Sequence, residues 1–508
     1  MATYVGRSEN ERQEMLRTAG ARALKDLLGS VPKSLRDKAQ ISLHEGLSEF
    51  DMAASMSEIA SSNLSSPSAA CFAGAGVYDH FVPAAIRSLL SRSEFYTCYT
   101  PYQAEVSQGT LQAIFEYQSL ICRLTGMDVC NASMYDAATA LAEAALLAVN
   151  ATGKRKVLVS ATVHPSYRRV LRTYCASTQI EVEEIPSEGG HTDIAKLRSA
   201  LAGGTPGAAP AAESPKGGSP TGSPAPGLPK GEALDSGSPA VGSPATGASH
   251  EGTAPDPGVA CFIHQQPNFY GTIENTFNIG ELLSPTPAFL ISCVDPLSLA
   301  LLEPPGNLGA DIVVGEGQVL GNPMNFGGPL LGFFASRQEN VRKLPGRIVG
   351  MTTDTSGRRG YVLTLQTREQ HIRRAKATSN ICTNEALVAL TATIYLALVG
   401  QNGLREIALQ CAAKSHYVAK KLTQLDGFSL EFRVPFFKEF VVRCPVPAHS
   451  LVDEALAKGI LAGVPLSRFS EDSKLLLIAV TEKRTRKEMD TLCEVLAEAS
   501  KKLLSRGA

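Results

Sequence analysis

The sequence predicts an α/β fold, in which a large domain with a mainly parallel sheet is followed by a smaller α+β domain. Four short apolar runs alternate with stretches of helical periodicity, at residues 156–160, 259–263, 289–294 and 311–314. Runs of this kind are typical of parallel strands that helices cover on both faces. After residue 383 the chain returns to long helices and then to a few shorter strand candidates. This change of pattern favours a separate carboxy-terminal unit.

Residues 1–65 are expected to form a helical arm. Charged and apolar residues alternate there at helical spacing, and a proline in the stretch 30–36 is typical of a connection between helices. The stretch 1–12 carries too many charged residues for the apolar core of a secretory signal. We therefore expect a cytoplasmic protein.

Residues 66–345 are predicted to form the large domain, with an insertion at 203–258. Apolar positions recur every three or four residues over 111–124, and 137–149 is almost wholly small or aliphatic, as in a helix packed on a sheet. In the insertion Gly, Pro, Ser and Ala dominate, and Gly-Ser-Pro recurs at 218, 222, 237 and 242. Such a segment cannot form a core. We predict an inert disordered insertion, with a functional linker or docking tail as the alternative.

Residues 346–508 are predicted to form long helices and the small α+β domain. Its strand candidates are 429–432, 440–443 and 475–480, and a Lys- and Glu-rich helix closes the chain. The longest apolar run, 386–400, contains two threonines and is shorter than the ~20 residues that span a bilayer. It predicts a buried helix and no association with membranes.

Composition excludes several functional classes. The 508 residues include 48 Lys and Arg against 49 Asp and Glu, a balance that gives no general attraction to nucleic acid or anionic lipid. The 11 cysteines form no Cys-x-x-Cys pair and no cluster with zinc-ligand spacing. We expect buried free thiols and no metal.

One position carries most of the functional information. The stretch 311–329 has the form of the strand and glycine-rich turn on which pyridoxal-phosphate enzymes display their Schiff-base lysine, but Gln318 stands where the lysine is expected. A neutral amide cannot form an imine. The residue at position 318 therefore distinguishes a self-sufficient enzyme from a partner that completes an active site elsewhere, and the rest of the chain must decide between these two possibilities.

The stretch 93–109 groups three tyrosines with glutamine and glutamate around a proline, without an amphipathic period. Such a loop presents rigid aromatic and hydrogen-bonding groups. Its Tyr-Thr-Pro-Tyr-Gln core resembles, nearly letter for letter, a segment of the glycine cleavage system P-protein family, the pyridoxal-phosphate-dependent glycine decarboxylases. Similar matches cover the chain outside the insertion, at 74–80, 131–136, 294–298, 310–315 and 373–383.

The resemblance implies a fold, a reaction and partners. Members of this family are one long chain of two related halves or two separate subunits, and this chain resembles the separate amino-terminal half. The implied fold is aspartate-aminotransferase-like, pyridoxal-phosphate fold type I. The partner, glycine dehydrogenase subunit 2, would hold pyridoxal 5'-phosphate covalently in an α2β2 heterotetramer. Together they would decarboxylate glycine and transfer the aminomethyl group to the lipoyl arm of H-protein.

The resemblance also identifies cofactor positions that we expect to be degenerate. Asp136 stands at the turn that would cup the phosphate, where it would repel an anion and cap the following helix instead. Asp295 matches the carboxylate that pairs with the pyridine nitrogen, and His164 matches a ring-stacking histidine. With Gln318, these residues are expected to have structural roles.

Other residues are candidates for acting across the subunit interface. We expect catalytic contributions to the partner's site from Tyr99, Thr100, Tyr102, Gln103 and Glu105. The alternative is that these residues only shape the subunit contact. The segment 327–329 could approach the partner's phosphate by its backbone or simply form a tight turn. The basic run 368–374 could meet an acidic carrier protein, but most such runs are solvated helix faces.

Two other functions remain open. An autonomous pyridoxal-phosphate lyase would need a lysine elsewhere, such as Lys343 or Lys376, although neither follows a strand at the required place. A non-catalytic scaffold or regulatory subunit would keep the fold and no active-site role.

Overall fold

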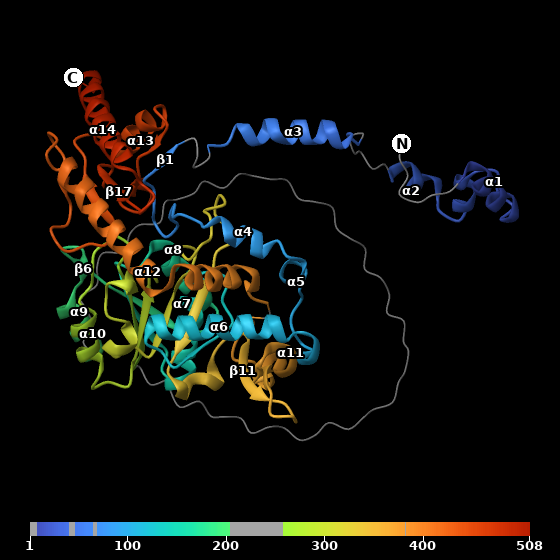
Figure 1. Cartoon of the computed structure of the whole chain (residues 1–508), viewed down its shortest axis with the longest axis horizontal. Coiled ribbons are helices and arrows are strands. Elements are labelled where there is room, and N and C mark those ends of the chain that lie inside the picture. The colour runs from blue at the N-terminus through green and yellow to red at the C-terminus, as the bar shows by residue number, and fades with distance from the viewer. Residues whose placement is uncertain (1–7, 40–45, 65–68, 204–257, 382, 508) are drawn as a thin grey trace. The chain divides into compact units, whose positions relative to one another are not determined.

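The computed structural model describes residues 8–39, 46–64, 69–203, 258–381 and 383–507 (Figure 1). The chain divides into two units, residues 1–65 and 66–508. Most of the predicted insertion at 203–258 lies outside the described residues.

The described part of the first unit is helical. It contains α1 (Glu9–Thr18), α2 (Lys33–Lys38) and α3 (Glu49–Ser61). A capping box between Ser8 and Glu11 begins α1, because each side chain accepts a hydrogen bond from the backbone of the other residue.

A seven-stranded sheet forms the centre of the second unit, in the order β2-β10-β9-β8-β7-β3-β4. All pairs from β9 to β4 are parallel, and β10 is antiparallel to both neighbours. The strands are β2 (Val129–Cys130), β3 (Lys156–Ser160), β4 (Glu181–Ile185), β7 (Val259–Gln266), β8 (Phe289–Val294), β9 (Ile312–Glu316) and β10 (Gly332–Ser336). The predicted α/β class with a mainly parallel sheet is confirmed.

Helices pack on this sheet. The alanine-rich α7 (Ala137–Thr152) contacts β7 to β10 and is buried along most of its length, since its small side chains allow close approach. A hairpin packs on α6 (Gln108–Thr125); it consists of β11 (Ile348–Thr353) and β12 (Arg359–Thr364). The remaining elements of the large domain are α4 (Ala84–Leu90), α5 (Ser93–Tyr96), α8 (Pro165–Ala176), β5 (Ser187–Glu188), β6 (His191–Thr192), α9 (Ile194–Leu201), α10 (Thr276–Leu283) and α11 (Gln370–Arg373).

The helix predicted at 386–400 continues as α12 (Ala386–Leu422), with a kink at Gly400, where φ is +59°. By length and composition α12 could cross a membrane. Part of its apolar surface fills cores, since Ala392 and Tyr395 lie in the core of the large domain and Val418 and Leu422 lie in that of the small domain, whereas Leu398 and Leu409 are exposed. Figure 1 shows α12 beside α6 and reaching the small domain.

The small domain contains a four-stranded antiparallel sheet in the order β13-β14-β17-β16. The β1 strand (Ala70–Cys71) pairs with β15 (Ile460–Leu461), so the chain passes through this domain before it enters the large one. The other elements are β13 (Ser429–Leu430), β14 (Glu439–Arg443), α13 (Ala448–Leu456), β16 (Val464–Pro465), β17 (Leu475–Ala479) and α14 (Arg486–Gly507).

Candidate active site

Gln318 lies just beyond the carboxyl end of β9, where its side chain is fully buried. Its amide oxygen accepts a hydrogen bond from the Tyr78 N–H at 3.0 Å, and its amide nitrogen donates to the Tyr78 carbonyl at 3.1 Å. The same nitrogen donates to the Asn322 carbonyl at 2.7 Å. The amide therefore joins the strand end to the loop 74–80, using both donor and acceptor groups. A lysine could not accept the Tyr78 N–H.

The amino terminus of α7 is occupied by a carboxylate of the chain itself. Glu316 accepts the Ala137 N–H at 3.2 Å, and it also accepts the backbone N–H groups of Gln318 and Leu331 at 3.1 and 2.8 Å. A helix amino terminus attracts anions. Glu316 thus occupies the position where the resemblance places the cofactor's phosphate, and burial raises the pKa of its carboxyl group to about 7. Glu316 was not among the predicted site residues, although an acidic side chain at the end of an apolar strand was a signal.

Asp136 adds a second carboxylate at the same helix end. It is the N-cap of α7, and its side chain accepts the Thr139 N–H at 2.7 Å. A phosphate would meet two carboxylates here, and the free amino-terminal N–H groups that it needs are partly used. This turn does not fit the phosphate.

Asp295 is paired with a lysine of the small domain. Its Oδ2 lies 2.7 Å from the Nζ of Lys438, which is almost completely buried and lies 3.7 Å from the centre of the Tyr78 ring. The carboxylate that the resemblance assigns to the pyridine nitrogen therefore has an internal cation. Lys438 was not predicted, because it lies far from Asp295 in the sequence.

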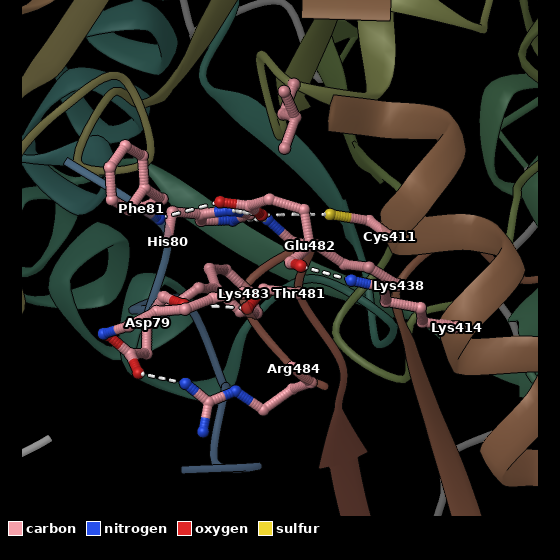
Figure 2. Close-up of polar contacts among 12 residues, drawn as sticks. Asp79, His80, Phe81, Cys411, Lys414, Lys438, Thr481, Glu482, Lys483 and Arg484 are labelled. Carbon is pink, nitrogen blue, oxygen red and sulfur yellow. Dashed lines mark hydrogen bonds and ion pairs between the residues drawn. The ribbon is translucent and has the colours of Figure 1, made fainter. Parts of the chain in front are cut away.

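A hydrogen-bonded series of polar groups continues from Lys438 (Figure 2). The Nζ of Lys438 lies 3.0 Å from Nε2 of His80, and Nδ1 of His80 lies 2.6 Å from Glu482. Burial and the neighbouring Lys438 lower the pKa of His80. We infer a neutral imidazole that accepts from Lys438 and donates to Glu482.

His80, Glu482 and Cys411 form a group with metal-ligand chemistry, since their ligand atoms lie within 4.8 Å of one another. The group does not fit a metal ion, because both ring nitrogens of His80 are already used and the Lys438 ammonium is adjacent. In addition, Lys414 donates to the backbone carbonyl of Glu482. The arrangement is a hydrogen-bonded network that ends at the Lys438–Asp295 ion pair.

His164 caps a helix rather than facing an open site. Its Nδ1 accepts the Ser166 N–H at 3.1 Å, and its Nε2 lies 3.0 Å from the Ala75 carbonyl. The ring stacks on Tyr167, with centroids 4.5 Å apart. Burial lowers the pKa of His164 to about 4, so the ring is neutral at pH 7.

The contacts described above show whether this chain could bind pyridoxal phosphate at the positions that match the family's cofactor site. Gln318, Glu316, Asp295 and His164 each bind a group of the chain itself, and the loop 74–80 connects several of them. The residues present do not fit pyridoxal phosphate. No chemical step can be assigned to this pocket.

The residues that were predicted to contribute to the partner's active site lie on the surface of this chain. Tyr99 and Tyr102 are 81% and 50% exposed, Gln103 and Glu105 are also exposed, and Thr100 is partly exposed. The Tyr102 hydroxyl accepts a hydrogen bond from Arg347 at 3.2 Å. The structure does not bring these residues into the degenerate pocket, and their action on a partner stays a prediction.

The surroundings of this loop are apolar. Tyr96, three residues before this loop, lines a mainly apolar cleft of about 580 Å³ together with Val82, Ile86, Leu90 and Leu387. Exposed aromatic and aliphatic groups around a concave surface are typical of a protein interface. The turn at 324–329 borders the cleft, and Gly327 has a φ of +108°, which a tight turn explains.

The basic run 368–374 was the other predicted contact, and its first two residues make contacts within the chain. Arg368 donates to the Leu344 carbonyl, and Glu369 is buried beside His371. The following residues up to 374 are exposed.

Buried carboxylates in this region make a testable prediction for pH. Burial raises the pKa of Glu439 to about 7 from its ordinary 4.5. The folded state therefore binds more protons than the unfolded state between these values, and stability falls as pH rises through this range. A shift of this size corresponds to roughly 3 kcal/mol. Glu439→Gln should flatten the decline, because an amide can accept the Ala75 N–H and donate to the Tyr78 hydroxyl.

Urea unfolding between pH 5 and 8 measures this effect. Glu471→Gln, at an exposed position, is the matched control and should retain the wild-type slope. Equal slopes for wild type and Glu439→Gln would show that Glu439 is ionised throughout the range.

The comparisons with known proteins agree on one family. The family model described as glycine cleavage system P-protein matches residues 2–206 and 244–496. The chain is 45% identical over 494 residues to a probable glycine dehydrogenase (decarboxylating) subunit 1 of Chlorobaculum parvum, covering 97% of this chain and 99% of the relative. A protein of the same description from Carboxydothermus hydrogenoformans is 46% identical with the same coverage.

Solved structures support the fold. A crystal structure of glycine decarboxylase (P-protein) of the glycine cleavage system, in inhibitor-bound form, is 39% identical with a TM-score of 0.78, covering 98% of this chain and 100% of that chain. An alanine–glyoxylate aminotransferase from Nostoc sp. is 13% identical with a TM-score of 0.52, covering 91% of this chain and 98% of that chain. The predicted aspartate-aminotransferase-like fold is confirmed.

Proposed function

The chain belongs to the glycine cleavage system P-protein family, as the enzyme's subunit 1, and on this basis we propose that it is the lysine-lacking subunit of a two-subunit glycine decarboxylase. Its partner is glycine dehydrogenase subunit 2, which holds pyridoxal 5'-phosphate covalently. The complex decarboxylates glycine and transfers the aminomethyl group to the lipoyl arm of H-protein. We further propose an α2β2 heterotetramer in the cytoplasm.

The observation that carries this proposal is that the positions which would bind the cofactor in this chain are occupied by the chain's own side chains. Gln318 cannot form an imine and is fixed by three hydrogen bonds, while Glu316 occupies the amino terminus of α7 and Lys438 pairs with Asp295. When bound in the partner, the cofactor supplies an electron sink for the carbanion left by decarboxylation. This chain contributes side chains to that active site and covers one side of it.

The loop 99–105 is the part of this chain that we propose to reach the partner. The loop follows Tyr96, which lines an apolar cleft, so a second subunit that covers the cleft and extends past Tyr96 would bury the exposed groups of the loop. There Tyr99, Thr100, Tyr102, Gln103 and Glu105 would orient substrate and exclude water.

A double substitution in the reconstituted complex tests this role. We expect Tyr102→Phe with Gln103→Ala to lower glycine decarboxylation at least tenfold, on the order of the loss of one or two oriented hydrogen bonds. Release of labelled carbon dioxide measures the rate, and gel filtration measures assembly. Gln410→Ala, at an exposed glutamine outside the loop and the cleft, is the matched control and should keep full activity.

The same experiment separates the two other functions. Unchanged decarboxylation with intact assembly would support the scaffold or regulatory subunit. A yellow, borohydride-reducible chain after purification without a partner would instead support the autonomous lyase.

A further inference from the structure

Arg347, which immediately precedes β11, is a buried arginine without a carboxylate partner among the residues that the structure describes. Only 5% of the residue is exposed. Its Nη2 donates to the Tyr102 hydroxyl at 3.2 Å and its Nη1 to Asn384 Oδ1 at 3.4 Å. Its Nε has no hydrogen-bond partner within the described part of the chain. A guanidinium taken out of water to this degree is normally paired with an anion.

The groups around Arg347 are fixed and neutral. Its backbone carbonyl accepts the Ala132 N–H at 2.8 Å, and the Asn384 amide donates to Ser133 Oγ at 2.7 Å. The Tyr102 ring lies 5.5 Å from the guanidinium carbon, in cation–π contact. The guanidinium is thus held in a fixed position, and no anion among the described residues neutralises its charge.

The nearby acidic group is already engaged. Glu369 pairs with His371 at 3.6 Å, and the His371 ring meets the edge of Tyr102. Among the described residues no carboxylate lies within ion-pair distance of Arg347. The missing anion must therefore come from outside the described chain.

We propose that Arg347 and the Tyr102 hydroxyl bind an oxyanion in the partner subunit's active site, either the cofactor's phosphate or glycine's carboxylate. This inference rests on the proposed function and deepens it. A guanidinium presents paired N–H donors that match two oxygens of such a group, and the Tyr102 hydroxyl can rotate to donate as well. Tyr102 is half exposed in a loop that a partner would cover, so the site would be completed across the interface.

The phosphate is the expected source. Decarboxylation converts the substrate's carboxylate into neutral carbon dioxide, so a cation that held this group would stabilise the substrate more than the transition state. A phosphate keeps its charge throughout the reaction. Arg347 would then be a residue that positions the cofactor.

Arg347→Met and Arg347→Lys test the proposal, with Arg358→Met as the matched control. Arg358 is an exposed arginine on the same hairpin, paired with Asp354. In the cofactor-free complex, absorbance titration should show pyridoxal phosphate binding at least tenfold more weakly with Arg347→Met and by an intermediate factor with Arg347→Lys. The glycine dissociation constant, from the absorbance change of the loaded complex, should move less than threefold. Arg358→Met should match wild type in both.

The isolated chain supplies a second readout. Because Arg347→Met removes a buried charge that has no acidic partner, the melting temperature of the isolated chain should not fall. The affinity between the subunits, from analytical ultracentrifugation, should stay within threefold of wild type. A purely structural arginine would give a lower melting temperature or weaker assembly.

Each outcome decides the proposal. Weaker cofactor binding supports it with phosphate as the source, and weaker glycine binding supports it with carboxylate as the source. It is overturned if both affinities stay at wild-type values, or if only assembly or melting temperature changes. A wild-type complex that binds no cofactor and releases no carbon dioxide would contradict the proposed function itself.

Discussion

Replacing Lys438 by methionine is expected to destabilise the chain by about 3–5 kcal/mol, the usual result of removing one member of a buried ion pair. Asp295 would keep a partly buried carboxylate without its cation at 2.7 Å. His80 would lose the donor to its Nε2. The methionine has nearly the same length, so the loss reports charge and hydrogen bonding more than packing.

Urea unfolding monitored by circular dichroism measures this loss. Lys458→Met is the matched control, because Lys458 pairs with Glu498 at an exposed position and should change stability little. The double variant Lys438→Met with Asp295→Leu should recover much of the loss, since it leaves no buried charge unpaired. A single variant as stable as wild type would show that the Lys438–Asp295 pair has no net effect on folding.

Gln318→Lys is expected to leave the isolated chain unable to bind pyridoxal phosphate, even though it restores the residue type that the chemistry requires. Glu316 still occupies the helix end and Lys438 still neutralises Asp295. The substitution should also cost about 1–3 kcal/mol, because the buried Tyr78 N–H would lose its acceptor.

An absorbance spectrum with added pyridoxal phosphate, followed by borohydride treatment and mass measurement, tests the result. Gln338→Lys, at an exposed glutamine, controls for non-specific reaction with a surface lysine. A yellow product modified at residue 318 would show that the pocket is open and that the missing lysine alone prevents binding.

Much of the fold could be predicted because local patterns determine it. The run 156–160 is β3, and the alanine-rich stretch from 137 is α7. Local patterns were insufficient where distant segments pair. The contact between β1 and β15 joins segments almost 400 residues apart, and the helical chain resumes after the non-helical Gly400 to pack in the core of the small domain.

The site was predictable in part for the same reason. Gln318 departs from a motif and could be identified at once, whereas Lys438 and Arg347 belong to none of the motifs described above. A signal was present for Lys438, since it stands with Glu439 between Phe437 and Phe440, where charged side chains are buried and need partners. The identity of those partners depends on the folded structure.

The contacts of the loop 74–80 also restrict motion within this chain. Its residues bind the small domain through Tyr78 with Glu439, Asp79 with Lys483 and Arg484, and His80 with Glu482. Together with the Lys438–Asp295 pair, these contacts join the large and the small domain. A rotation of one domain away from the other would leave several buried charged groups without their partners. We therefore expect the two domains of this subunit to keep a fixed arrangement, so that conformational changes during turnover occur in other parts of the complex.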